Sequence, residues 1–143
     1  MLSMSTIERL VQLAIQARIH SYAPYSRFYV GAALLAEDGT VYTGCNIESA
    51  AFSPSNCAER TAFFKAVSEG KRQFQAIAVA GGSEPLGATA LERAVTPCGV
   101  CRQVMAEFCQ PTFQIIAVRS EKDYRIFSLQ ELLPQSFGQA DLA

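Results

Sequence analysis

The sequence predicts an α/β fold in which helices cover both faces of a β-sheet. Segments whose apolar residues recur at helical spacing alternate with short apolar runs that are typical of strands. This alternation favours a sheet that lies between two helical layers. The chain has 143 residues, of which 50% are hydrophobic, and this is enough for one domain with a buried core. We therefore expect residues 1–143 to form a single domain.

The first half of the chain is expected to begin with a helix and to continue with a β-hairpin. Ser5-Thr-Ile-Glu8 has the pattern of a capping box, and apolar residues then recur at helical spacing to about Ser21. Pro24 restricts the residue before it to extended backbone and ends this region. The hairpin is expected to consist of strands at 28–35 and 41–46 and a turn at Glu37-Asp-Gly39.

The second half of the chain alternates between helices and strands. Gly70 is expected to close a helix, and Gly81 with Gly82 to end a strand. Ser128-Leu-Gln-Glu131 is a second capping box and predicts a short final helix. The predicted elements are a helix at 58–68, a strand at 75–80, a helix at 98–108, strands at 113–118 and 125–127, and the final helix.

Two cysteine motifs coincide with the beginnings of two predicted helices. Cys57-Ala-Glu59 opens the helix at 58–68, and Pro97-Cys98-Gly-Val-Cys101 opens the next one. Right-handed crossovers make the strands before these helices parallel, so both helices begin at the same edge of the sheet. Ligands of α/β proteins bind at that edge. We therefore expect the three thiols to meet in space, although Cys98 follows Cys57 by 41 residues.

Three thiols and a nearby carboxylate are the components of a catalytic zinc site. A catalytic zinc ion has three protein ligands and keeps its fourth position for water, and thiolates are favoured at helix N-termini. Glu59 lies two residues after Cys57, where a carboxylate can act as general acid and base. A glutamate in the first turn of a helix is also favourable when it is merely solvated, because of the helix dipole. Its position inside the cysteine motif favours catalysis.

Arg60 is expected to offset the negative charge of the metal site. Zinc with three thiolates carries a net charge of −1, which weakens the ion as a Lewis acid. A guanidinium three residues after Cys57 can donate hydrogen bonds to the thiolate sulfurs and restore the Lewis acidity of the ion. The alternative for Arg60 is an ordinary surface ion pair.

Other interpretations of the cysteines stay open from the sequence. A structural zinc site usually has four protein ligands. Cys45 or Cys109 could supply the fourth, whereas the only histidine, His20, lies in the first predicted helix. A redox Cys-x-x-Cys pair is the other alternative, but it leaves Cys57 and Glu59 without a role.

The composition of the chain limits which binding partners and which cellular compartment we expect. The net charge is −1 and no run of basic residues occurs, which argues for a small-molecule substrate and against nucleic acid. No segment reaches the roughly 20 apolar residues that cross a bilayer, and the N-terminus does not resemble a signal peptide. Five cysteines, an odd number, fit reduced thiols and a cytoplasmic location. Only 17% of residues are charged, which hints that other subunits cover some apolar surface.

Nearly the whole chain resembles the small zinc-dependent cytidine deaminases. The Cys-x-Glu with a later Pro-Cys-x-x-Cys is the general signature of zinc-dependent nucleobase deaminases. The longer segments that match are Ala23-Pro-Tyr-Ser-Arg-Phe-Tyr-Val-Gly-Ala-Ala-Leu-Leu35, Gly44-Cys-Asn-Ile-Glu48, Asn56-Cys-Ala-Glu-Arg-Thr-Ala62, Pro97-Cys-Gly-Val-Cys-Arg-Gln103 and Leu132-Leu-Pro-Gln-Ser-Phe137. The resemblance implies a three-layer α/β/α fold with a mixed five-stranded sheet, and one zinc ion per chain. It also implies hydrolysis of cytidine and 2′-deoxycytidine to uridine and 2′-deoxyuridine in pyrimidine salvage, by a homotetramer with shared active sites.

The resemblance also assigns substrate-binding residues. Asn46 and Glu48 fall where the family holds the ribose hydroxyls, and alternate positions at a strand end do face the same way. Phe28 falls where an aromatic ring stacks near the pyrimidine, and the Ala58 N–H is expected to hold the base carbonyl. Phe137 matches an aromatic residue that a neighbouring subunit contributes. Without the resemblance, these positions would be read as turn, surface or core residues.

The sequence departs from the family in small ways and leaves rival functions to test. Phe52 stands where some relatives carry tyrosine, and Pro54 restricts the loop before the first cysteine. The three-cysteine set fits the short tetrameric form better than the two-domain form or the nucleic-acid editors. The rivals are a deaminase of another aminopyrimidine such as a nucleoside antibiotic, an editor of single strands, and a zinc-stabilised binding module.

Overall fold

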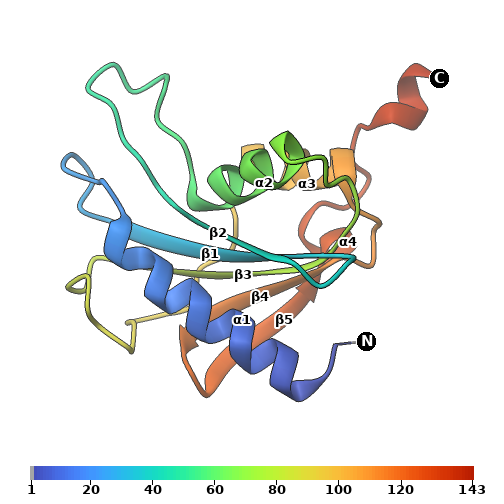
Figure 1. Cartoon of the computed structure of the whole chain (residues 1–143). Helices are drawn as coiled ribbons and strands as arrows, with labels where there is room; N and C mark the ends of the chain where they lie inside the picture. The colour runs from blue at the N-terminus through green and yellow to red at the C-terminus, as the bar shows by residue number, and fades with distance from the viewer. Residues whose placement is uncertain (1) are drawn as a thin grey trace.

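The computed structural model describes residues 2–143, which form a five-stranded sheet with helices on both sides (Figure 1). The predicted order of helices and strands is confirmed. The elements are α1 (Met4–Ala17), the 3₁₀ turn η1 (Arg18–His20), β1 (Tyr29–Ala36), β2 (Val41–Cys45), α2 (Ala58–Ser68), β3 (Phe74–Gly82), α3 (Gly99–Phe108), β4 (Gln114–Ser120), β5 (Asp123–Ser128), α4 (Leu129–Leu132) and the 3₁₀ turn η2 (Gln139–Leu142). In the part of the chain that is described, no helix combines the length and the apolar character that a bilayer span requires.

The sheet is mixed, and its strand order is β2-β1-β3-β4-β5. β1 pairs antiparallel with both β2 and β3, β3 pairs parallel with β4, and β4 pairs antiparallel with β5. β2 and β3 therefore run in the same direction, as expected, with β1 between them. Because α2 follows β2 and α3 follows β3, both helices begin at the same edge of the sheet.

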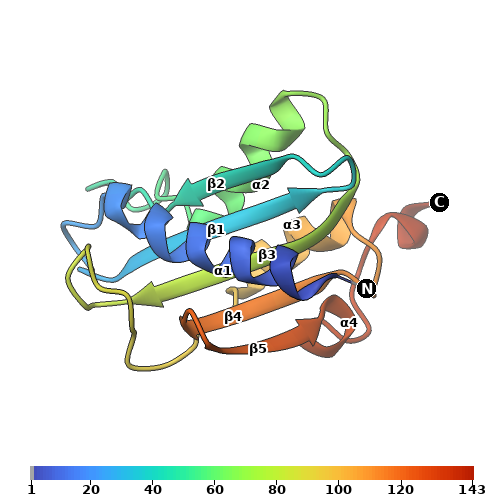
Figure 2. The ribbon, with the colours of Figure 1, turned by 60° about the horizontal axis from the view of Figure 1, so that its bottom comes forward.

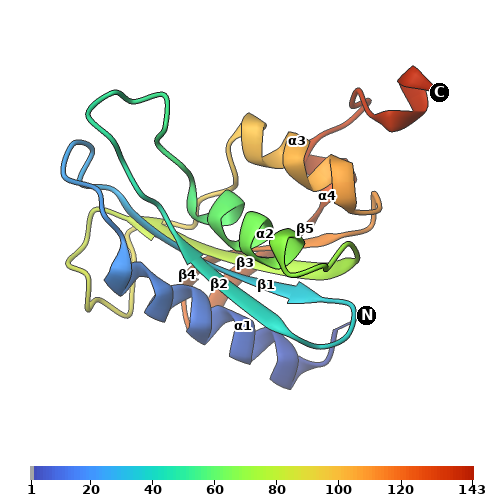
Figure 3. The same ribbon diagram turned by 45° about the horizontal axis from the view of Figure 1, so that its top comes forward.

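The helices divide between the two faces of the sheet, which confirms the three-layer prediction. α1 crosses one face alone (Figure 2), whereas α2 and α3 cover the other (Figure 3). Each face has its own buried cluster because neighbouring residues of a strand point to opposite sides. Leu34, Ile77 and Phe63 belong to the cluster beneath α2 and α3, and Leu35, Leu10 and Val11 to the cluster beneath α1.

Two glycines let helices approach the sheet closely. A Cβ atom at Gly31 of β1 would lie 2.1 Å from the carbonyl oxygen of Ala14 in α1. A Cβ atom at Gly44 of β2 would lie 2.5 Å from the carbonyl oxygen of Ala58, at the start of α2. Real Cβ atoms do not approach backbone this closely, so both positions need glycine. Gly44 thereby fixes where α2 begins relative to the sheet.

The predicted start of the first helix was wrong by two residues. α1 begins at Met4, and Ser3 is its N-cap, with a side chain that accepts the Thr6 N–H at 3.2 Å. Ser3 has the extended backbone of an N-cap, whereas Ser5 already lies in the helix. The helix ends at Ala17 and continues as η1 rather than reaching Ser21 as α-helix.

Two further sequence predictions have different outcomes. The third strand was predicted to stop at Ala80, but β3 continues through Gly81 and ends at Gly82, because these two glycines pair with Val30 and Tyr29 of β1. The second capping box is confirmed: Ser128 Oγ accepts the Glu131 N–H at 3.1 Å. The Glu131 carboxylate in turn accepts the Ser128 N–H at 2.7 Å.

Candidate metal centre and active site

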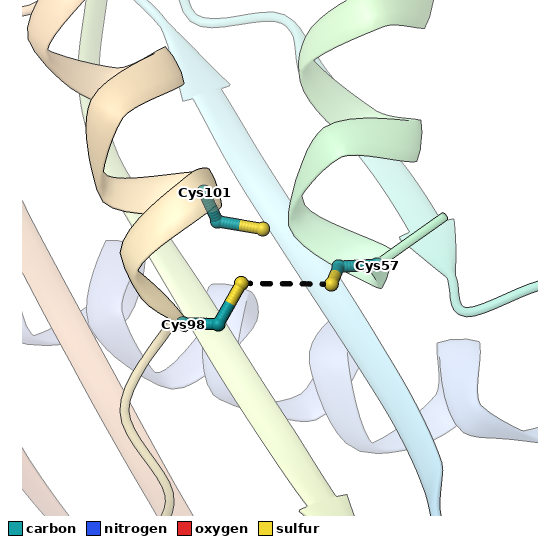
Figure 4. Close-up of side chains that lie close together, drawn as sticks. All are labelled: Cys57, Cys98 and Cys101. Carbon is teal, nitrogen blue, oxygen red and sulfur yellow. Dashed lines mark hydrogen bonds between the residues drawn. The ribbon is translucent and has the colours of Figure 1, made fainter. Parts of the chain in front are cut away.

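Three cysteine sulfurs converge between the N-termini of α2 and α3. Cys57 is the N-cap of α2, Cys98 is the N-cap of α3, and Cys101 lies in the first turn of α3. The three sulfur atoms lie within 4.8 Å of one another (Figure 4). The expectation that the two motifs meet at one sheet edge is therefore confirmed. Within residues 2–143, this cluster includes neither Cys45 nor Cys109, so a fourth cysteine ligand is not supported.

The spacing of the sulfurs fits zinc. Two thiolates bound tetrahedrally to one zinc ion at about 2.3 Å lie about 3.8 Å apart. The sulfurs of Cys57 and Cys98 are 3.8 Å apart. A disulfide requires about 2.05 Å, and all five cysteines are free. The donor set therefore suits one zinc ion per chain better than a redox pair.

The environment of Cys57 favours a thiolate. Hydrogen bonding from Cys101, together with bonds from Arg60 and Cys98, lowers the pKa of Cys57 to about 5. The same sharing of a proton with Cys57 raises the pKa of Cys101, as does burial. The guanidinium Nη2 of Arg60 lies 3.3 Å from the Cys57 sulfur. Arg60 therefore contacts the sulfur cluster, as the sequence suggested, and its positive charge lies where thiolate charge gathers.

Glu59 is a buried carboxylate beside this cluster. It occupies the second position of α2 and is only 5% exposed. Burial, and then the negative charge of Cys57, raises the pKa of Glu59 to about 7. A carboxyl group with a pKa near neutrality can both accept and release a proton at working pH. The solvated alternative for Glu59 is wrong, because the side chain is out of water.

One cavity of about 400 Å³ joins the metal centre to most of the predicted substrate-binding residues. This volume is within the range of small-molecule sites, and most of its lining is apolar. The predicted residues that line it are Phe28, Asn46, Glu48, Cys57, Ala58, Glu59, Arg60 and Cys98. The structure therefore brings together residues from three separate parts of the sequence.

The Asn46 amide is largely occupied by protein contacts. Its Oδ1 accepts the Val30 N–H at 2.8 Å and a bond from the Ser21 hydroxyl. Its Nδ2 donates to the Phe28 carbonyl at 2.7 Å. An amide has two N–H groups, so one of them is left for a ligand. Asn46 thus also joins the end of β2 to the start of β1, which the sequence did not indicate.

Ala58 and Phe137 differ in their relation to the cavity. Ala58 is the first residue of α2, and the first N–H groups of a helix have no partner inside it, so they can bind a ligand. Phe137 is 61% exposed and does not line this cavity. It lies on the C-terminal segment that leaves the body of the protein (Figure 1), where its carbonyl accepts a 2.8 Å bond from Gln103 Nε2.

Sequence reasoning missed several residues that shape the site. The cavity is also lined by Ser26, Val30, Ser55, Asn56, Val79, Val95 and Thr96. Arg102 holds the loop before α3, because it donates to the Pro97 carbonyl at 2.6 Å and the Thr96 hydroxyl at 3.0 Å. Arg102 lies in one of the segments that resemble the family, four residues after Cys98, but no residue pattern indicated these two hydrogen bonds.

Arg18 is another residue whose role the sequence did not indicate, and it is fully buried. Its guanidinium donates to the carbonyls of Tyr29, Gly82 and Glu84 at 2.9, 3.0 and 2.9 Å. Burial lowers the pKa of Arg18, and the charge of Glu84 opposes that effect. These bonds tie the end of α1 to β1 and to the loop after β3. An arginine at the end of an amphipathic helix gives no sequence signal of such a role.

Two helices start at one edge of a mixed sheet, and their cysteine sulfurs meet beside a buried glutamate. This arrangement defines a zinc-dependent deaminase. The family model described as the cytidine and deoxycytidylate deaminase zinc-binding region matches residues 4–117. This chain belongs to that family.

Comparisons with individual proteins support the same family. The chain is 49% identical over 137 residues to a protein named cytidine deaminase from Sporosarcina psychrophila, covering 96% of this chain and 95% of the relative. It is 47% identical over 135 residues to a cytidine deaminase from Halalkalibacterium halodurans, covering 94% and 96%. The crystal structure of cytidine deaminase from Burkholderia pseudomallei superposes with a TM-score of 0.81 at 42% identity, covering 95% of this chain and 100% of that one.

Proposed function

We propose that this protein hydrolyses cytidine and 2′-deoxycytidine to uridine and 2′-deoxyuridine, with release of ammonia. The observation that carries the proposal is the buried Glu59 beside three converging cysteine sulfurs, in a cavity of the right size for a nucleoside. The close relatives, which are named cytidine deaminases, support the choice of substrate.

Cys57, Cys98 and Cys101 would hold a zinc ion. Arg60 would partly neutralise the charge of the three thiolates through its hydrogen bond to the Cys57 sulfur. Zinc held in this way supplies a Lewis acid that lowers the pKa of a water molecule toward neutrality.

Glu59 moves the protons of the reaction. Its carboxylate accepts a proton from the water whose oxygen attacks C4 of the base, and delivers a proton to the ring nitrogen N3. A second proton, taken by Glu59 from the oxygen that has been added at C4, is delivered to the exocyclic nitrogen. The bond between C4 and that nitrogen then breaks, ammonia leaves, and a carbonyl forms at C4. The balance is one water consumed and one ammonia released. The buried environment that raises the pKa of Glu59 to about 7 suits a group that takes and gives protons.

The remaining cavity residues orient the nucleoside. The Phe28 ring packs near the pyrimidine, and the Ala58 N–H donates to the carbonyl of the base. The ribose hydroxyls bind Asn46 and Glu48. Asn46 contributes a single free N–H, because the rest of its amide holds β1 and β2 together. Glu48 contributes an acceptor.

The protein acts as a homotetramer whose subunits complete one another's active sites. Phe137, which is exposed on the C-terminal segment, is the residue that a neighbouring subunit contributes. Phe52 is 69% exposed on the loop before α2, and its ring lies 5.9 Å from that of Tyr25 in an edge-to-face contact. Large exposed aromatic side chains, such as those of Tyr25 and Phe52, are typical of an interface. Phe52 lacks the hydroxyl that a tyrosine gives some relatives at this position, so the polar contact that this hydroxyl would make between subunits is absent.

The cellular role follows from the substrate and the thiols. The chain works as one deaminase domain, residues 1–143, in pyrimidine salvage. Five free cysteines fit the reducing cytoplasm. A net charge of −1 fits a free nucleoside rather than nucleic acid.

A combined assay tests this function. Purified protein is analysed for zinc per chain and for ammonia release from cytidine, 2′-deoxycytidine, cytosine and the nucleoside antibiotic blasticidin. We expect one zinc per chain and turnover of the first two substrates only. Glu59→Ala should keep zinc and fold but lose turnover, which separates an enzyme from a zinc-stabilised binding module. Faster turnover of blasticidin or of single-stranded DNA would overturn the proposal.

A further inference from the structure

The two loops at the mouth of the cavity form one hydrogen-bonded unit. Residues 21–28 lead into β1, and residues 46–57 lead from β2 to α2; they lie side by side (Figures 1 and 3). The Tyr22 N–H donates to the Asn46 carbonyl at 3.0 Å, and the Glu48 N–H donates to the Tyr22 carbonyl at 2.8 Å. The first loop therefore has a fixed position relative to Glu48.

A left-handed residue shapes this first loop. Arg27 has a φ of 55°, which is uncommon for a residue other than glycine. Its N–H donates to the Ala23 carbonyl at 3.0 Å, so the chain turns tightly just before Phe28. Unfavourable backbone that is held by its surroundings is a reason to look for a function nearby. The consequence of the turn is that the Phe28 N–H reaches back to the Ser26 hydroxyl.

Ser26 links two of the candidate substrate-binding residues, Phe28 and Glu48. Its Oγ accepts the Phe28 N–H at 3.1 Å and donates to Glu48 Oε2. The backbone N–H groups of Tyr25 and Ser26 donate to Glu48 Oε1 at 3.0 and 3.1 Å. Both carboxylate oxygens are therefore held. These bonds, the one from the Ser26 hydroxyl first, lower the pKa of Glu48, so it is ionised and acts only as an acceptor.

The number of bonds limits what Glu48 can bind. An ionised carboxylate has about four acceptor sites. The protein occupies three of them, and about one is left for a hydroxyl group of a ligand in the cavity. The orientation of that last site depends on Oε2, and the Ser26 hydroxyl is the group that holds Oε2.

We propose that Ser26 is a positioning residue for sugar recognition. Its hydroxyl orients the Glu48 carboxylate to accept one ribose hydroxyl, and the same oxygen fixes the backbone of Phe28. Ser26 acts through Glu48 and needs no contact with the reacting atoms. The inference rests on the proposed function, since it requires a nucleoside in this cavity.

The test compares a substrate that has ribose hydroxyls with one that lacks them. Steady-state kcat and KM are measured for cytidine and 2′,3′-dideoxycytidine with the zinc-loaded enzyme and Ser26→Ala. We expect KM for cytidine to rise about tenfold with little change in kcat, because a charge-assisted hydrogen bond is lost from binding alone. Any displacement of Phe28 affects both substrates and cancels in the ratio of their kcat/KM values. That ratio should therefore fall about tenfold.

Three further variants sharpen the result. Ser26→Thr keeps a hydroxyl and should restore most of the ratio. Ser26→Ala added to Glu48→Gln should change the ratio no further, because residues that act together are not additive. Ser83→Ala, at an exposed serine in the loop after β3, is the matched control and should behave as wild type.

The outcomes separate this inference from the proposed function. An equal loss of kcat/KM for both substrates in Ser26→Ala, or an additive effect with Glu48→Gln, would overturn the positioning role while leaving the deaminase proposal in place. A wild-type protein that releases ammonia from neither substrate would overturn the proposed function, and the inference with it.

Discussion

Replacing Glu59 with glutamine should stabilise the metal-free protein at neutral and alkaline pH. The carboxylate is 5% exposed, and burial raises its pKa from 4.5 to about 7. Ionised Glu59 therefore opposes folding when no metal is bound. At about 1.4 kcal/mol for each pKa unit, this rise corresponds to about 3 kcal/mol. Glutamine has nearly the same shape and no charge, so it removes this cost.

The pH range follows from the direction of the shift. Because the pKa in the folded state lies above that in the unfolded state, the stability associated with protonated Glu59 is fully present below about pH 4.5. It is lost as the pH rises through about 7. The two proteins should thus be nearly equal in stability near pH 4.5, and Glu59→Gln should be more stable by about 3 kcal/mol at pH 8.

The difference in stability between wild type and Glu59→Gln is measured by urea unfolding after a chelator has removed the metal. Both proteins are compared at equal subunit concentration, and unfolding is followed by circular dichroism. Glu121→Gln, at an exposed glutamate in the turn between β4 and β5, is the control and should have little effect at either pH. A stability difference that does not change between pH 4.5 and pH 8 would refute the reasoning. So would a Glu59→Gln protein that is less stable than wild type at pH 8.

Three other predictions concern the metal, a buried cation and a close contact. Cys98→Ser should reduce zinc per chain severalfold by atomic absorption, whereas Cys109→Ser should retain it, because Cys98 belongs to the sulfur cluster and Cys109 does not. Arg18→Met should lower the free energy of urea unfolding by about 3 kcal/mol, because one buried and two partly buried carbonyls lose their donor; a change below about 0.5 kcal/mol would contradict this role. Gly31→Ala should lower the melting temperature by several degrees, whereas Gly87→Ala, where an added Cβ atom meets open space, should not.

The site could be read from the sequence largely because its chemistry is local. The Cys-x-Glu and Pro-Cys-x-x-Cys motifs each occupy one helix start, and the right-handed crossover rule brings those starts together. The order of elements was equally accessible, because apolar spacing separates helices from strands. The position of the first N-cap was not, since Ser3 and Ser5 both suit a cap and backbone geometry alone distinguishes them.

The features that the sequence did not reveal depend on contacts between distant segments. Asn46 holds the start of β1 because β1 and β2 pair in a particular register. Arg18 is buried because Gly31 lets α1 approach the sheet, so an ordinary helical arginine meets three carbonyl oxygens. Gly81 and Gly82 extend β3 because β1 is long enough to pair with them. In each case a partner far along the chain decides the outcome.

The separation of the interior into two clusters has a consequence for the loss of metal. The sulfur ligands join α2 to α3 on one side of the sheet only, and the cluster beneath α1 lies on the other side. Chelation should therefore increase amide hydrogen exchange in α2 and α3, while α1 keeps its protection. In this architecture a bound ion stabilises the layer that carries the active site, whereas the opposite layer keeps its structure without the ion.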